Sequence, residues 1–158
     1  MNNILSKIIP LILMLMLFSC TYKPIFSEKD YNFKIDEIIF KGEKDINKEI
    51  KRGLSLIKKN TNDNKNTYNL LIETIENKII ISKDSKGDAI KFEINILAYF
   101  EITKDQKILF KNNIKKSNIY NNVSDKFKLE QNEKIIIGNL SEKISEEIIS
   151  SITNLNDN

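Results

Sequence analysis

The sequence predicts an α+β fold: a two-layer sandwich in which two helices pack on one face of a four-stranded, mostly antiparallel sheet. Three observations lead to it. Apolar and polar residues alternate for thirteen residues over 90–102, as in a strand with one buried face. Two other segments, 45–59 and the stretch from about 127 onward, repeat apolar residues at helical spacing. The remaining alternating segments are strands, so the predicted order is β-α-β-β-β-α.

The first strand is expected over Tyr31–Phe40. Phe33 and Ile35 alternate with polar residues, and so do Ile38 and Phe40. The skip between the two pairs predicts a bulge or a shift of face.

The first helix is expected to begin with Asp45 as its cap and to run to about Lys59. Gly53 lies inside it and costs roughly 1 kcal/mol relative to alanine. Its apolar residues fall on one face, which predicts packing against the sheet. They are Ile46, Ile50, Leu54 and Ile57.

The second strand begins with the alternation of Tyr68, Leu70 and Ile72 and continues over 79–81 after an interruption at Asn77-Lys78. Residues 83–88 then form a hairpin connection in which Gly87 can adopt a positive φ. Because short turns join antiparallel neighbours, the third strand, over 90–102, is expected to pair with the second.

The fourth strand returns after a turn at 104–106 and runs from Ile108 to about Ile119. The last helix begins at about Phe127 after a polar stretch. Its apolar residues recur every four positions, which predicts a second helix on the same face of the sheet. They are Ile136, Leu140, Ile144, Ile148 and Ile152.

The composition predicts one domain without a catalytic constellation. The chain has 158 residues, a net charge of +3 and no histidine, so the commonest general base and metal ligand is missing. Its single cysteine excludes an intramolecular disulfide and a zinc–thiolate cluster. Charges are mixed along the chain and Arg52 is the only arginine, whereas nucleic-acid binders carry a dense basic face. We expect a protein that is not an enzyme and binds no metal, cofactor or nucleic acid.

The first twenty residues have the pattern of a lipoprotein signal. A positive region up to Lys7 precedes the apolar run 8–18, which is too short to span a bilayer at about 20 residues and fits a signal peptide. Leu17-Phe18-Ser19-Cys20 resembles a bacterial lipobox, which implies cleavage between Ser19 and Cys20 and attachment of acyl chains such as palmitate to Cys20. The alternatives are a buried helix of the mature domain and an ordinary thiol.

These signals divide the chain into a signal peptide at 1–19, a lipidated tether at 20–30, a domain at 31–153 and a polar tail at 154–158. Thr21 follows Cys20, where aspartate is associated with inner-membrane retention in Gram-negative lipoproteins. The lipobox resemblance therefore implies a lipid anchor in the outer membrane, at its periplasmic face.

Two pairs of lysines are candidates for contact with an anionic partner such as lipid phosphate. Lys83 and Lys86 lie at the tip of the hairpin that follows the second strand, and Lys126 and Lys128 precede the last helix. The alternative is that they are ordinary surface lysines that keep the protein soluble.

Four stretches match the motifs of one known family in order and spacing. Residues 20–26, Cys-Thr-Tyr-Lys-Pro-Ile-Phe, are similar to its Cys-Gly-aromatic-basic-Pro-apolar-aromatic opening, with threonine in place of glycine. Residues 117–121 are similar to its Ser-x-x-Tyr segment, and 125–133 to the stretch that leads into its last helix. Residues 139–144 are similar to its Asn-Leu-Ala-x-x-Ile pattern. In these stretches the chain resembles the lipopolysaccharide-assembly lipoprotein family LptE.

The resemblance implies a function. LptE proteins sit as a plug inside the outer-membrane β-barrel LptD, help it to assemble, and take part in delivering lipopolysaccharide to the cell surface. Lys86 and Lys128 stand, by spacing, at the family's basic lipopolysaccharide contacts. LptD and lipopolysaccharide are therefore the expected partners. The solvent-exposed face of the strands and the hairpin tips are expected to contact the barrel. Two alternatives stay open: another lipoprotein adaptor, such as a secretion-system pilot, and a periplasmic carrier of lipid.

Overall fold

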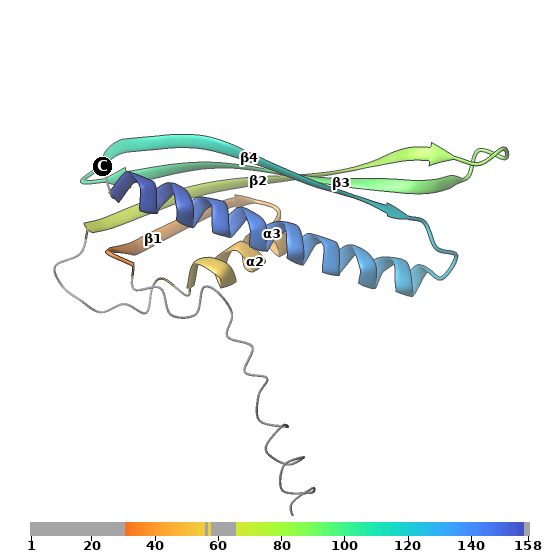
Figure 1. The fold of residues 1–158 in the computed structure, drawn as a ribbon, viewed down its shortest axis with the longest axis horizontal. Helices are drawn as coiled ribbons and strands as arrows, with labels where there is room; N and C mark the ends of the chain where they lie inside the picture. Colours follow the sequence, from red (N-terminus) through yellow and green to blue (C-terminus); the bar gives the residue numbers. More distant parts are fainter. Residues whose placement is uncertain (1–30, 56, 58–65, 157–158) are drawn as a thin grey trace, which may run out of the picture.

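The computed structural model describes residues 31–55, 57 and 66–156, and it confirms the predicted α+β architecture. Helices and strands follow one another in the order β-α-β-β-β-α (Figure 1). Their bounds are β1 Phe33–Gly42, α2 Lys44–Ser55, β2 Asn66–Lys83, β3 Ala89–Lys104, β4 Lys107–Asn121 and α3 Lys126–Asn156.

The four strands form one mixed sheet in the order β1-β2-β3-β4. β1 pairs with β2 in parallel, because α2 carries the chain back between them, and β2, β3 and β4 form an antiparallel meander. Figure 1 shows both helices on the same side of the sheet. Within the described residues, the sheet is therefore covered on one face, as the alternation in β3 predicts.

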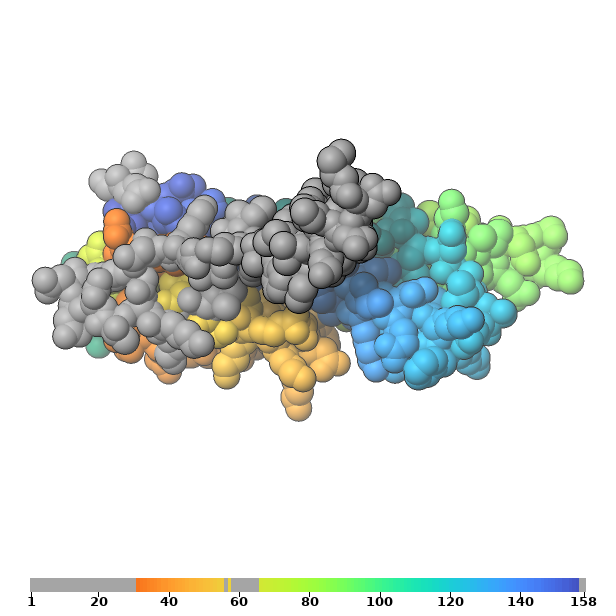
Figure 2. All heavy atoms as spheres, turned by 60° about the horizontal axis from the view of Figure 1, so that its bottom comes forward, coloured from red at the N-terminus to blue at the C-terminus, as the bar shows by residue number. Residues whose placement is uncertain are grey.

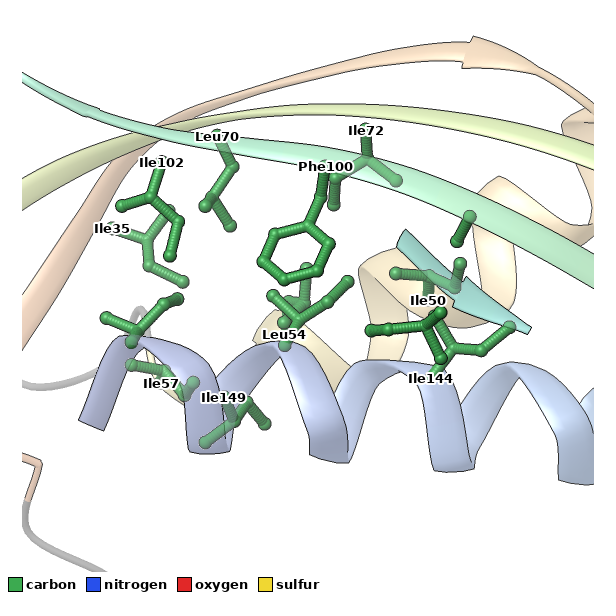
Figure 3. Packing of buried hydrophobic residues seen from close by; sticks show 14 of the residues in the cluster. Ile35, Ile50, Leu54, Ile57, Leu70, Ile72, Phe100, Ile102, Ile144 and Ile149 are labelled. Carbon is green, nitrogen blue, oxygen red and sulfur yellow. The ribbon is translucent and has the colours of Figure 1, made fainter. Parts of the chain in front are cut away.

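The core lies between the helices and the covered face of the sheet. The helical stripe of α2 and the alternate residues of β2 and β3 are nearly inaccessible to solvent. Figure 3 shows Phe100 and Ile72 of the sheet directed toward Leu54 of α2 and Ile144 of α3. Burial of this apolar surface is the main favourable contribution to folding.

The predicted bulge in β1 is present, as a shift in the register with β2 between Ile35 and Ile38. Both residues direct their side chains into the domain: Ile35 is buried and Ile38 packs against the edge of the core. The extra residue therefore keeps the strand's apolar side chains on one face across the irregularity.

Asp45 does not cap α2, because the helix begins one residue before it. Gly42 has a φ of 85° and turns the chain directly from β1 into the helix. Glu43 occupies the cap position: its carbonyl accepts the first helical hydrogen bond from Asn47 at 2.9 Å. The N–H of Glu43 donates in turn to the hydroxyl of Thr74 at 3.1 Å. Asp45 lies in the first turn, where a carboxylate still interacts favourably with the helix dipole.

β2 is continuous, so the predicted interruption at Asn77-Lys78 does not exist. Asn77 pairs with Asn95 and Lys78 with Ile94 in an unbroken stretch of ladder. The period-two pattern thus continues through the polar residues, and it places Glu76 and Lys78 on the helix-covered face with Ile72.

α3 begins at Lys126 and is capped by Asp125, whose Oδ1 accepts the N–H groups of Phe127 at 3.0 Å and Lys128 at 3.2 Å. It continues to Asn156, past the expected end of the domain at 153. Leu155 packs against the core, which explains why the helix continues.

The two helices cross at Gly53. A Cβ atom built on this glycine would lie 2.2 Å from the Ser145 Oγ and 2.8 Å from its Cβ. A side chain at this position would therefore separate α2 from α3. Close helix packing explains a glycine that helix propensity alone disfavours.

Burial divides the molecule into two halves. In the proximal half, β1 pairs with β2 as far as Thr74, α2 lies in the helix layer, and α3 buries side chains from Leu140 onward. In the distal half, β2 to β4 extend beyond the end of β1, and residues 126–139 of α3 have no buried side chain. Figure 1 shows the three strands and the start of α3 reaching past α2 at this end.

Candidate functional site

The predicted lipidation site lies outside the described residues, as does the predicted cleavage between Ser19 and Cys20. Among residues 31–55, 57 and 66–156, no helix is long and apolar enough to cross a membrane. The same residues contain no group of three or more histidine, cysteine, aspartate or glutamate side chains that could hold a metal ion.

Lys86 lies at the tip of the β2–β3 hairpin, beyond the last pair of the ladder. Asp84 shapes the turn, because its Oδ1 accepts the N–H groups of Lys86 and Asp88, both at 2.9 Å. Gly87 adopts the predicted positive φ, 91°. The turn therefore uses the carboxylate of Asp84 internally and presents the Lys86 side chain to solvent.

Lys128 lies in the first turn of α3 and is also exposed. Its ammonium is 3.8 Å from Asp125 Oδ2, at the limit of an ion pair, and Asp125 already caps the helix through its other oxygen. An exposed contact of this kind contributes about 0–1 kcal/mol, so the Lys128 side chain can turn to another anion at little cost.

Both lysines lie at the same end of the molecule, here called the distal tip: the hairpin turn 83–88 and the connection 122–128. Asn122 ties the two parts together, with its N–H donating to the Ile90 carbonyl at 2.7 Å and its side-chain amide to the Ala89 carbonyl at 2.8 Å. Figure 1 and Figure 2 show the hairpin and the start of α3 at this same end, the hairpin in the sheet layer and α3 in the helix layer. Lys86 and Lys128 nevertheless stand on separate elements, and no shared contact joins them within the described residues.

Large apolar side chains are exposed at this end of the molecule: Phe127 next to Lys128 in the chain, and Ile80 and Ile90 in the strands that lead into the hairpin. Phe127 is 69% exposed, Ile80 50% and Ile90 43%. A surface that combines lysine ammonium groups with exposed apolar side chains can bind a molecule with anionic headgroups and acyl chains. Lysine contacts phosphate as a point charge, and this suits a flexible headgroup.

A second cluster holds α3 to the sheet behind the distal tip. Lys78 of β2 forms an ion pair with Glu133 of α3 at 2.5 Å. The Tyr120 hydroxyl donates to the same Glu133 oxygen at 2.7 Å. The Lys78 ammonium also lies 4.5 Å from the centre of the Phe92 ring, within range of a cation–π interaction. We call these four residues the clamp.

The clamp perturbs the acid–base properties of its members. Burial raises the pKa of Tyr120, and its hydrogen bond to Glu133 raises it further. Burial alone would raise the pKa of Glu133, but the hydrogen bonds from Lys78 and Tyr120 outweigh it and lower that pKa below its ordinary value. Glu133 is therefore a carboxylate near neutral pH, and it neutralises Lys78 in the half-buried space between α3 and the sheet.

None of the clamp residues is among the site residues predicted from the sequence. The sequence does contain a sign of the clamp in β2. The two-residue alternation of Tyr68, Leu70 and Ile72 continues to Glu76 and Lys78, which places these charged residues on the helix-covered face. A charged residue at an inward position of a strand requires a partner. The partner, Glu133, comes from a helix 55 residues later in the chain, and only the fold brings the two together.

The face of the sheet opposite the helices carries a hollow of about 300 Å³ beside Tyr99. Leu71 and Asn113 contribute to its lining, and Lys111 and Glu101 form an ion pair across it at 2.6 Å. Ile75 and Leu97 are adjacent on the same face. This face therefore presents apolar and charged side chains next to each other.

Comparison with known proteins shows the fold. No family model and no curated protein matches the chain. Among solved structures, rare lipoprotein B from Shewanella oneidensis superimposes with a TM-score of 0.54 at 15% identity, covering 76% of this chain and 98% of that one. Lipoprotein B from Nitrosomonas europaea superimposes with a TM-score of 0.58 at 11% identity, covering 85% of this chain and 91% of that one. A minor lipoprotein from Acinetobacter baumannii superimposes with a TM-score of 0.51 at 16% identity, covering 73% of this chain and 91% of that one. The chain thus has the fold of several bacterial lipoproteins.

Proposed function

We propose that this chain is an outer-membrane lipoprotein of the LptE type. In this role it is anchored through Cys20 at the periplasmic face, plugs the lipopolysaccharide-export barrel LptD and helps it to assemble. It also assists the insertion of lipopolysaccharide into the outer leaflet. Its role is one of binding and assembly, with no catalytic step.

The distal tip is the observation that carries this proposal. It has exposed lysines on the hairpin and on the first turn of α3 together with exposed Phe127, and exposed Ile80 and Ile90 lie in the strands that lead to it. Lipopolysaccharide offers the matching chemistry, phosphate groups joined to acyl chains. Lys86 and Lys128, which the family resemblance singles out, are both in this surface.

The fold and the motifs support the same assignment. The structures it resembles are named as lipoproteins, two of them as lipoprotein B. The chain also has the lipobox at 17–20 and the Tyr22–Phe26 opening that resembles LptE. In the proposed complex, the amphipathic face of the sheet opposite the helices lies against the barrel wall.

Co-purification tests the partner. The tagged full-length protein, solubilised with outer membranes in mild detergent, is expected to bring down one large β-barrel identifiable as LptD by mass spectrometry. A secretion-system barrel in its place would favour the pilot alternative. Recovery without any barrel would overturn the proposed plug function.

Lipopolysaccharide binding tests the distal tip. Lys86→Asp combined with Lys128→Asp is expected to weaken binding of lipopolysaccharide at physiological salt, with an unchanged circular dichroism spectrum. The matched control is Lys48→Asp with Lys143→Asp, which makes the same charge change on exposed helical sites in the proximal half. If both double variants lost lipopolysaccharide binding equally, the loss would follow from net charge alone, and the distal tip would not be the binding surface.

The anchor is tested through Cys20. Cys20→Ser is expected to abolish acylation, seen as the loss of the acyl mass, and to release part of the protein from outer membranes on fractionation. A variant that partitions as the wild type does would show that a protein partner, and not the lipid, holds the domain at the membrane.

A further inference from the structure

β2 has an open edge in the distal half. β1 pairs with β2 only as far as Gly42 opposite Thr74, where the chain turns away into α2. β2 continues to Lys83, paired with β3 on its other side. In the part of the chain that the structure describes, no strand lies against the β1 side of Ile75–Lys83, here called the open edge. Its backbone N–H and C=O groups on that side are therefore available to another strand.

The opposite edge of the sheet carries lysines along its whole length, whereas the open edge is protected only at its end, where the register with β3 shifts between Ile80 and Lys83. β4 carries four lysines in fifteen residues, Lys107, Lys111, Lys115 and Lys116, and charged residues of this kind discourage strand pairing. The open edge has Lys78 and Lys83. The Lys78 side chain turns onto Glu133 and the Phe92 ring, and Lys83 is the last residue of the strand, beside the hairpin turn. The remaining sequence, Ile79-Ile80-Ile81, is strongly strand-forming and 40–50% exposed.

Glu76 gives the open edge a charge preference. Its side chain is half-buried on the helix-covered face, and its pKa is raised by burial and by the acidic groups of Glu43 and Glu133, with a further contribution from Asp45. Lys78 opposes this effect, but Lys78 is already paired with Glu133. The site is therefore short of positive charge. A cation placed beside Glu76 would be stabilised.

We propose that the open edge of β2 binds an extended segment of a partner protein as a fifth strand, with a lysine or arginine of that segment beside Glu76. The added strand continues the line of β1 and gains main-chain hydrogen bonds along the six residues from Ile75 to Ile80, which pair with β3 in unbroken register. Its alternate side chains on the other face pack against Ile75 and Ile79, which are 47% and 40% exposed. The segment recognised is thus an apolar β-strand with one basic residue.

A second copy of this chain fits the edge poorly. Antiparallel pairing of two copies over the regular part of the edge places Ile80 opposite Glu76 and the two Lys78 residues opposite each other, so it supplies no cation to Glu76. The register that places Lys78 of a second copy opposite Glu76 also places its Thr74 against Ile80 of the first copy. Thr74 is already paired with β1. The occupant is therefore a different chain.

Peptide binding tests the proposal independently of any barrel, so its failure is distinguishable from failure of the proposed function. The isotope-labelled full-length chain, in detergent, is titrated with a capped eight-residue peptide of alternating valine and threonine that has a central lysine. The amide resonances of residues 75–83 are expected to shift, with about tenfold weaker binding of the peptide that has glutamate at the centre. Shifts confined to the β4 edge, or no preference between the peptides, would overturn the proposal.

Two variants and one matched control test which residues of the edge bind the peptide. Ile79→Lys places a charge at the open edge and is expected to abolish the shifts. Ile119→Lys is its matched control, because Ile79 and Ile119 flank Glu93 in one cross-strand row on the same face, at opposite edges of the sheet. Glu76→Gln should remove the preference for the lysine peptide while leaving binding itself. A dimer of the free chain that Ile79→Lys converts to monomer would assign the edge to a second copy and contradict the proposal.

Discussion

The two halves of this domain are held together by different physical means. In the proximal half, β1 and α2 complete a core in which Ile50, Phe100 and Ile144 are inaccessible to solvent. In the distal half the same sheet and the same helix α3 continue without β1 and α2, and the clamp Lys78–Glu133–Tyr120–Phe92 joins them. The proximal half provides stability. The distal half leaves apolar and charged groups available for binding, and the tip and the open edge are both there.

The largest effect is expected from removing a core side chain on the proximal part of α3. Ile144→Ala creates a cavity and should lower the free energy of unfolding by about 2–5 kcal/mol. Ile136→Ala, two turns earlier on a half-buried site, should cost about 1 kcal/mol or less. Urea denaturation followed by circular dichroism measures both. Similar losses would show that the distal part of α3 packs as tightly as the proximal part.

The two helical glycines provide a second contrast. Gly53→Ala should destabilise by about 1–3 kcal/mol, because the new methyl group meets Ser145, whose hydroxyl is fixed by donating to the Glu142 carbonyl at 2.7 Å. Gly138→Ala, where no atom lies within 4 Å of the new Cβ, should stabilise by about 0.5–1 kcal/mol through helix propensity. Thermal melts of the two variants should move in opposite directions. A gain in both would mean that α2 and α3 are not in close contact at Gly53.

The clamp is expected to contribute less than the core. Tyr120→Phe removes a hydrogen bond to a charged acceptor and should cost about 1–2 kcal/mol. Combined with Glu133→Gln, it should cost less than the sum of the two single variants, because both remove the same interaction. A double-mutant cycle in urea measures this coupling. Strictly additive losses would show that the Tyr120 hydroxyl and Glu133 act independently.

The smallest effect is a pH dependence of opposite sign at two glutamates. The folded pKa of Glu133 is lowered, so its stabilising contribution is present above the ordinary carboxyl pKa and is lost as pH falls through the lowered value. The folded pKa of Glu76 is raised, so its contribution is present below the ordinary pKa and is lost as pH rises through the raised value. Relative to the wild type, Glu133→Gln should therefore be less stable at neutral pH and Glu76→Gln more stable.

Melting temperatures of the two variants, measured between about pH 3 and pH 7, test this difference. The gap between Glu133→Gln and the wild type should close in acid. The advantage of Glu76→Gln should also disappear there. A Glu76→Gln variant that is less stable than the wild type at pH 7 would mean that the carboxylate already has a cationic partner in the free protein.

Much of the fold is visible in the sequence because its signals are local. The strict alternation over 90–102, the four-residue repeat from Ile136 to Ile152, and Gly87 in the hairpin each specify one element through its own neighbours. The skip between Ile35 and Ile38 likewise predicts the bulge. Asp45 was assigned as a cap because its residue type is favoured there, but the position of Gly42 set the start of the helix.

The candidate site was predicted only in its exposed lysines. Lys86 and Lys128 come from turns that adjoin predicted elements, so their exposure follows from their position in the chain. The clamp requires that β2 be continuous through Asn77 and that α3 lie across it, and neither condition is local. The open edge depends in addition on the parallel pairing of β1 with β2, which no residue pattern of either strand reveals.

The sequence by itself determined the elements, their buried faces and the turns that connect them, because these depend on side chains close together in the chain. The tertiary structure decided how far each layer extends. β1 has ten residues and β2 eighteen, and the pairing of Gly42 with Thr74 sets the point at which the short strand ends beside the long one. Beyond that point, among the described residues, β2 has no neighbouring strand on its β1 side and α3 no longer lies beside α2. The distal half is consequently open, because pairing and coverage are properties of several segments together.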